Sequence, residues 1–69
     1  MTTFYVKTET TTGETERSEY PTIGKARDAA AILRRHARET VRRIDVCRDT
    51  GRIVDAWDRD AAHRWNRSI

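Results

Sequence analysis

The chain has 69 residues, of which 36% are charged and 36% are hydrophobic, and it contains a single cysteine. This length predicts one domain, residues 1–69, with a single-layer core and no room for two lobes around a catalytic cleft. One cysteine excludes an internal disulfide. The sequence shows neither an apolar run of about 20 residues nor a signal peptide. We therefore expect a soluble, intracellular protein.

The net charge is +3, but the charges are unevenly distributed along the chain. Residues 1–20 carry two basic and four acidic side chains, residues 21–43 carry seven and two, and residues 44–69 carry five of each. An acidic segment beside a basic one predicts a polarised surface. Arginine outnumbers lysine twelve to two. This excess favours bidentate contacts with carboxylate or phosphate, and the codon bias of a GC-rich genome explains it equally well.

The first 20 residues predict a β-hairpin. Residues Thr3–Glu9 alternate between two faces, with Phe4 and Val6 directed inward. A threonine-rich turn that ends at Gly13 follows. Residues Glu14–Tyr20 are rich in charged side chains and poor in apolar ones, which is typical of a solvent-exposed edge strand.

The stretch after Pro21 predicts an amphipathic helix that begins at the N-cap Thr22 and runs to about Arg38 or Glu39. Mostly small apolar side chains fall on one side of it, so we expect it to lie close to a sheet. These residues are Ala26, Ala30, Leu33 and Ala37, with Ala29 and His36 at the edge.

Two further strands, Val41–Arg48 and Arg52–Asp58, flank the loop Asp49-Thr50-Gly51, which predicts a second hairpin. The expected register pairs Cys47 with Ile53. It also places five further pairs opposite each other: Arg48 and Arg52, Val46 and Val54, Asp45 and Asp55, Ile44 and Ala56, Arg43 and Trp57. The side chains expected against the helix are Ile44, Val46, Val54 and Ala56. The other, open face would show Arg43, Asp45, Cys47, Ile53, Asp55 and Trp57.

A polar turn over residues 58–60 and a short last strand within residues 62–67, around Trp65, complete the predicted elements. Together they predict an α+β fold, with one amphipathic helix packed on one face of a single antiparallel sheet. The sheet would have four to five strands in the order 2-1-3-4-5 (β-β-α-β-β-β).

The residues offer little for catalysis, so we expect no enzyme activity, no cofactor, no metal and no small-molecule ligand. His36 is expected to be partly buried by packing, and His63 to be solvated. One cysteine and two distant histidines lack the clustering of a zinc site. Cys47 is expected to be a small packing residue on the open face. The sequence has no glycine-rich phosphate loop.

Two predicted pairs on the open face have alternative interpretations. Asp45 opposite Asp55 is destabilising unless Lys7 and Arg43 relieve it, or the pair receives a cationic side chain from a partner. Arg43 opposite Trp57 is either an internal cation–π pair or part of a partner-binding hot spot.

A basic stripe beside the apolar side of the helix is the strongest functional indication. Arg27, Arg34 and Arg38 project together along about 16 Å of helix. Further basic residues flank them: Lys25, Arg35, Arg42 and Arg43. Such a stripe suits a phosphate backbone or an acidic protein groove, or it simply keeps the helix solvated. Because Arg27 and Arg34 are expected to be exposed, reversing both charges should barely change the fold.

The chain resembles one of the small phage-encoded anti-CRISPR proteins that act on type I surveillance complexes. The similar stretches are Tyr5-Val6-Lys7, Thr22-Ile23-Gly24-Lys25-Ala26-Arg27, Thr40-Val41-Arg42-Arg43-Ile44-Asp45, Gly51, Ala56 and Arg64-Trp65. The element order and length class are also similar. In that family, basic residues at the helix start and along the helix contact the partner. Arg27 matches such a position with Lys25 nearby, whereas Asp28 stands where the similar protein has a basic residue.

The resemblance implies a phage-encoded inhibitor in the host cytoplasm. It would bind backbone Cas subunits of a type I complex, with a secondary contact to nucleic acid and none to a membrane, and exclude target DNA. The alternatives are a small non-enzymatic nucleic-acid-binding module, of phage or mobile-element origin, and an accessory protein that binds an acidic host protein. The partner-binding residues we expect are Lys25, Arg27, Arg34, Arg35, Arg38, Arg43 and Trp57.

Overall fold

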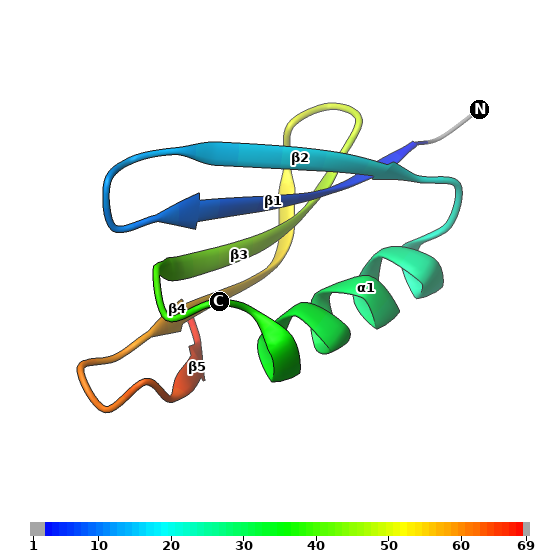
Figure 1. Cartoon of the computed structure of the whole chain (residues 1–69). Coiled ribbons are helices and arrows are strands. Elements are labelled where there is room, and N and C mark those ends of the chain that lie inside the picture. The colour runs from blue at the N-terminus through cyan, green and yellow to red at the C-terminus, as the bar shows by residue number, and fades with distance from the viewer. Residues whose placement is uncertain (1–2, 69) are drawn as a thin grey trace.

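The computed structural model describes residues 3–68, which form a five-stranded antiparallel sheet with a helix on one face (Figure 1). The elements are β1 (Phe4–Thr10), β2 (Thr15–Tyr20), α1 (Ile23–His36), β3 (Val41–Arg48), β4 (Ile53–Arg59) and β5 (Trp65–Arg67). The strand order is β2-β1-β3-β4-β5. The predicted fold class, element order and sheet order are therefore confirmed, with the larger of the two expected strand numbers.

The first hairpin places β2 at the edge of the sheet. All residues of β2 before Tyr20 are exposed, as expected for a strand that carries charged side chains to discourage further pairing. Gly13, with a φ of 85°, closes the turn by donating its N–H to the carbonyl of Thr10. Lys7 and Arg17 face each other across the hairpin, and the Arg17 guanidinium lies 4.6 Å from the centre of the Tyr5 ring.

Helix α1 begins as predicted, since the Thr22 side chain accepts a hydrogen bond of 3.2 Å from the N–H of Lys25. It ends at His36, two to three residues earlier than predicted, because Ala37 adopts an extended backbone conformation. His36 is exposed, so its predicted partial burial is wrong. The residue lies just outside the buried stripe of the helix and next to its end.

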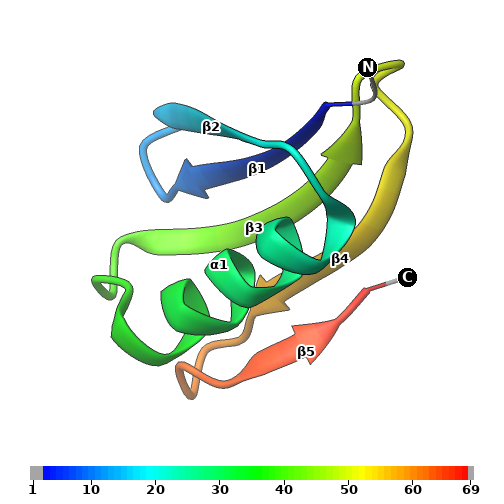
Figure 2. The same ribbon diagram turned by 90° about the vertical axis from the view of Figure 1, so that its right-hand side faces the viewer.

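The core lies between α1 and the strands beneath it. Figure 2 shows α1 in front of the sheet, with β5 running beside it. Ala26 and Ala30 of the helix are completely buried, so their small side chains bring the helix backbone close to the sheet. The sheet contributes the other members of the buried cluster, namely Phe4, Val6, Ile44 and Val46.

A β-bulge in the second hairpin changes the predicted register. Cys47 pairs with Ile53 as expected, but the next pair is Val46 with Asp55, so Val54 is an extra residue on β4. The loop length predicts the first pair correctly and cannot predict the inserted residue. Four predicted pairs are therefore wrong: Val46 with Val54, Asp45 with Asp55, Ile44 with Ala56, and Arg43 with Trp57.

The bulge reverses the faces of the rest of β4. Asp55 and Trp57 pair with the helix-facing Val46 and Ile44, so they lie on the helix side and not on the open face as predicted. Ala56, expected against the helix, lies opposite Asp45 on the other face, where it is buried. Val54 does pack against the core, as expected.

The C-terminal part of the sheet also differs in its boundaries. Strand β4 continues to Arg59, so the polar turn starts at Asp60 and not at Asp58. The Asp60 carboxylate accepts hydrogen bonds from the N–H groups of Ala62 and Arg64, at 2.9 and 3.0 Å. These bonds close the turn, and the bond from the backbone N–H of Arg64 is the largest cause of the lowered pKa of Asp60. His63 in this turn is exposed, as predicted.

No helix within residues 3–68 is both long enough and apolar enough to span a membrane.

Candidate binding groove between α1 and β5

Side chains of α1, β4 and β5 line a groove. Figure 2 shows the backbones of α1 and β5 running beside each other. The volume of the groove is about 340 Å³, and its lining comes from the helix and from the last two strands of the chain. These lining residues are Arg27 and Arg34 of α1, Asp55 and Trp57 of β4, and Arg67 of β5. The β4 bulge creates this groove, because it turns Asp55 and Trp57 towards the helix.

Asp55 is the anionic centre of the groove. Its side chain is only 4% exposed, and its two carboxylate oxygens accept from different arginines. Arg27 Nε donates to Oδ2 at 2.7 Å, and Arg67 Nη2 donates to Oδ1. A buried carboxylate is stable only when it is paired and hydrogen-bonded. The two ion pairs therefore explain how Asp55 is tolerated here, and they link α1 and β5 through β4.

Arg34 is positioned by Trp57. Its guanidinium carbon lies 4.0 Å from the centre of the Trp57 ring, which is cation–π geometry. Burial lowers the pKa of Arg34, and the nearby Asp55 carboxylate opposes this effect. Arg34 Nη1 is buried and has no hydrogen-bond partner among residues 3–68. The groove therefore contains a fixed guanidinium with an unused donor.

A second arginine–tryptophan pair lies at one end of the sheet, where the chain leaves α1. Arg59, only 8% exposed, has its guanidinium carbon 4.4 Å from the centre of the Trp65 ring. Its Nη1 donates to the carbonyl of Arg38 at 2.8 Å. The carbonyls that follow a helix are favourable sites for a cation. Arg59 thus holds the connection between α1 and β3, although the sequence predicted a turn residue at this position.

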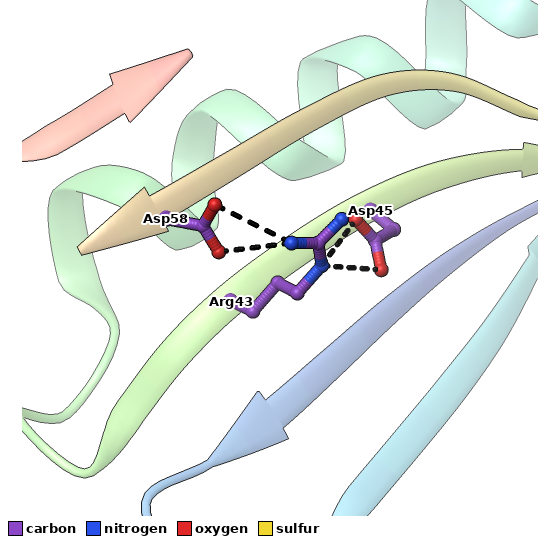
Figure 3. A network of polar contacts seen from close by, with 3 residues as sticks. All are labelled: Arg43, Asp45 and Asp58. Atoms are coloured by element: carbon purple, nitrogen blue, oxygen red, sulfur yellow. Dashed lines mark hydrogen bonds and ion pairs between the residues drawn. The ribbon is translucent and has the colours of Figure 1, made fainter. Parts of the chain in front are cut away.

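Arg43 belongs to a separate network on the open face of the sheet (Figure 3). Its Nε donates to both carboxylate oxygens of Asp45 at 3.0 and 3.1 Å, and its Nη1 donates to those of Asp58 at 3.1 and 3.3 Å. The hydrogen bond with Asp45 is the main cause of the raised pKa of Arg43. Arg43 therefore forms its ion pairs with residues of the sheet. It compensates the charge of Asp45, which was one of the two interpretations of the sequence.

The seven predicted partner-binding residues fall into three groups. Arg27, Arg34 and Trp57 line the groove, and Arg43 lies on the opposite face. The third group is exposed and makes no ion pair within residues 3–68. It consists of Lys25 and Arg35 on α1 and Arg38 just after it.

Asp55, Arg59 and Arg67 were missed as members of these clusters. Asp55 was assigned to the other face, and Arg67 carries no local pattern that distinguishes it from other surface arginines. The sequence feature that could have indicated these clusters is the equal number of arginines and aspartates, five of each, in residues 44–69. This balance favours ion pairing but does not identify the partners.

The single cysteine of the chain lies on the open face. Cys47 is half-buried beside Ile53, and burial raises the pKa of its thiol, which disfavours the nucleophilic thiolate. Within residues 3–68, no three His, Cys, Asp or Glu side chains are arranged to hold a metal ion.

Comparison of the chain with protein-family models, curated proteins and solved structures gives no match in any of the three.

Proposed function

We propose that this protein is a non-enzymatic, phage-encoded inhibitor that acts in the host cytoplasm on a type I CRISPR surveillance complex. It binds the complex and excludes target DNA. The observation that carries the proposal is the grouping of cationic side chains on and beside α1. The resemblance of the helix start, around Lys25 and Arg27, to a family with this activity supports the same assignment.

Charge distribution is compatible with such a partner. A surveillance complex combines an anionic guide RNA with a positively charged protein channel for the nucleic acid. The α1 side of this protein is basic, whereas the β1–β2 hairpin carries exposed acidic side chains, including Glu14, Glu16 and Glu19. A molecule with both kinds of surface can complement both components, and its competition with DNA would be steric and electrostatic.

The test uses assembled type I-F, I-E and I-C complexes and a labelled target duplex in a gel-shift assay. Preincubation with the protein should reduce duplex binding by the sensitive complex, and the protein alone should leave the free duplex unshifted. Inhibition of none of the three complexes, at protein concentrations well above that of the complex, would contradict the proposal for these subtypes.

Paired variants test whether the basic helix side makes the contact. Arg35→Glu with Arg38→Glu changes two exposed residues without an ion pair in residues 3–68 and should lower inhibition by about tenfold or more. The matched control is Arg48→Glu with Arg52→Glu, which makes the same charge change at the distant β3–β4 hairpin. Equal effects of the two pairs would mean that net charge, and not this surface, determines inhibition.

The alternative is a nucleic-acid-binding module. The observation that favours it is the stacking of Arg34 on Trp57 within a basic groove, since proteins that bind single strands combine aromatic platforms with basic grooves. In this case the protein would shift free nucleic acid without any complex. Its affinity would also fall steeply with salt concentration.

A further inference from the structure

The groove between α1 and β5 has more positive charge than its own carboxylate neutralises. Three arginines face one aspartate, which leaves a formal charge of +2. A guanidinium has five N–H donors. Arg27 and Arg67 each make one ion pair to Asp55, and their side chains are still 55% and 60% exposed. Most of their donors therefore remain accessible to a molecule that enters the groove.

Arg34 adds a donor that no described group uses. Its Nη1 is buried without a hydrogen-bond partner in residues 3–68, and such a group normally costs stability. The guanidinium carbon lies 4.0 Å from the centre of the Trp57 ring, and this cation–π contact favours the observed position of the side chain. Because Arg34 lines the groove, an anion bound there would lie close to this guanidinium and would offset the cost of its burial.

We propose that this groove binds a phosphate group, with Arg27, Arg34 and Arg67 as its ligands. Guanidinium forks match phosphate oxygens in geometry and charge. Phosphate presents oxygens in tetrahedral directions and carries one to two negative charges, so it can accept from arginines on two elements and balance the residual charge. A planar carboxylate is already present as Asp55, which keeps the arginines together when the groove is empty.

The phosphate group can come from two sources, a terminal monoester or a diester within a nucleic-acid strand. The groove volume of about 340 Å³ lies near the lower end of the roughly 300–1,000 Å³ typical of ligand pockets. It therefore accommodates a phosphate from either source together with part of an attached sugar. This inference does not depend on the proposed action on a surveillance complex, because it concerns the isolated protein.

The experiment is an NMR titration of the full chain at constant ionic strength, observing the Trp57 indole N–H and the arginine Nε–H signals. The probes are inorganic phosphate, thymidine 5′-monophosphate, a thymidine oligonucleotide without terminal phosphates, and acetate. Phosphate probes should shift the Trp57 and Arg34 signals saturably, and acetate should bind more weakly by about tenfold or more. Tighter binding of the monophosphate identifies a monoester site, and tighter binding of the oligonucleotide identifies a diester site.

Variants separate a built site from general electrostatic attraction. Arg67→Gln should weaken phosphate binding by about tenfold or more, whereas Arg17→Gln, which removes the same charge from the opposite face, should change it by less than about twofold. Arg34→Lys keeps the charge but loses the planar fork, so it should also weaken binding. If Arg67→Gln does not fold, Arg34→Lys with the Arg17→Gln control still decides the question.

The proposal is overturned if phosphate causes no saturable shift, or if acetate binds as tightly as phosphate. It is also overturned if folded Arg67→Gln and Arg17→Gln behave alike, or if Arg34→Lys binds phosphate as the unchanged protein does. None of these results bears on the surveillance-complex assay, so the two proposals fail separately.

Discussion

The arginines of α1 look alike in the sequence but have different roles in the structure. Arg27 neutralises the buried Asp55, Arg34 stacks on Trp57, and Arg35 is exposed. The sequence predicts that charge reversal of Arg27 and Arg34 leaves the fold unchanged. Arg27 is exposed as predicted, but Arg34 is half-buried, and new carboxylates at both positions would lie close to Asp55. We therefore expect this double charge reversal to lower stability. Binding variants are therefore better made at Arg35 and Arg38.

The first residue-scale prediction compares two aspartates of β4. Asp55→Asn should lower the free energy of unfolding by about 1–3 kcal/mol, because it removes the charge from two ion pairs at a buried site. Asp58→Asn should cost less than about 1 kcal/mol, since the Asp58 side chain is 49% exposed and Arg43 keeps Asp45. Urea denaturation of both variants measures the difference. Equal losses would mean that the groove ion pairs contribute no more than a surface pair.

The second residue-scale prediction concerns pH. Because burial raises the pKa of Cys47, folding disfavours its thiolate and should slow its alkylation. The unfolded thiol has the lower pKa, so Cys47 favours folding least at high pH, where the unfolded state loses its proton first. The midpoint of the pH–rate profile with iodoacetamide should be higher in the folded protein than in urea. A midpoint at or below that of the unfolded chain would contradict this account.

At the scale of elements, one inserted residue decides which side chains form the groove. The β3–β4 loop fixes the pair Cys47–Ile53, and the bulge at Val54 then moves every following residue to the other face. Two polar or amphipathic side chains, Asp55 and Trp57, thereby meet α1. Their partners on α1 and β5 compensate for placing a carboxylate on the core side of the sheet.

The bulge makes an element-scale prediction. Deletion of Val54 should remove the bulge and keep the pairs Val46–Asp55 and Ile44–Trp57, because Asp55 then directly follows Ile53. Asp55 and Trp57 should therefore stay on the helix side. We expect a loss of stability comparable with that of Val54→Ala, which keeps the bulge and loses only part of a half-buried side chain. Circular dichroism with urea denaturation compares the two. A severe loss of stability in the deletion variant alone would show that the fold needs the bulge itself and not only the pairs that follow it.

At the scale of the whole molecule, stability depends on very few buried side chains. Ile44 and Val46 are the largest fully buried ones among the described residues, and the helix contributes only alanines to the fully buried core. A stability of about 0.05–0.15 kcal/mol per residue gives roughly 3–10 kcal/mol for a chain of this length. Each large core side chain therefore accounts for a considerable part of the total.

The whole-molecule prediction follows from this small core. Ile44→Ala should lower the free energy of unfolding by about 2–5 kcal/mol and leave part of the population unfolded at 37 °C. The matched control is Ile32→Ala, since Ile32 is 59% exposed on α1, and it should cost less than about 0.5 kcal/mol. Thermal denaturation of both variants measures these two losses of stability. A small effect of Ile44→Ala would mean that the core is not concentrated between α1 and β3.

Local sequence patterns determined the elements, their order and the exposed edge strand of this protein. Alternation in β1, the Thr22 N-cap and the alanine stripe of α1 each depend on residues close in sequence, so they could be predicted from it. Only the tertiary structure decided the face of Asp55 and Trp57 and the contact between Arg67 and Arg27 through Asp55. The reason is physical. A bulge is one backbone irregularity whose benefit comes from distant partners, and no residue near Val54 encodes those partners.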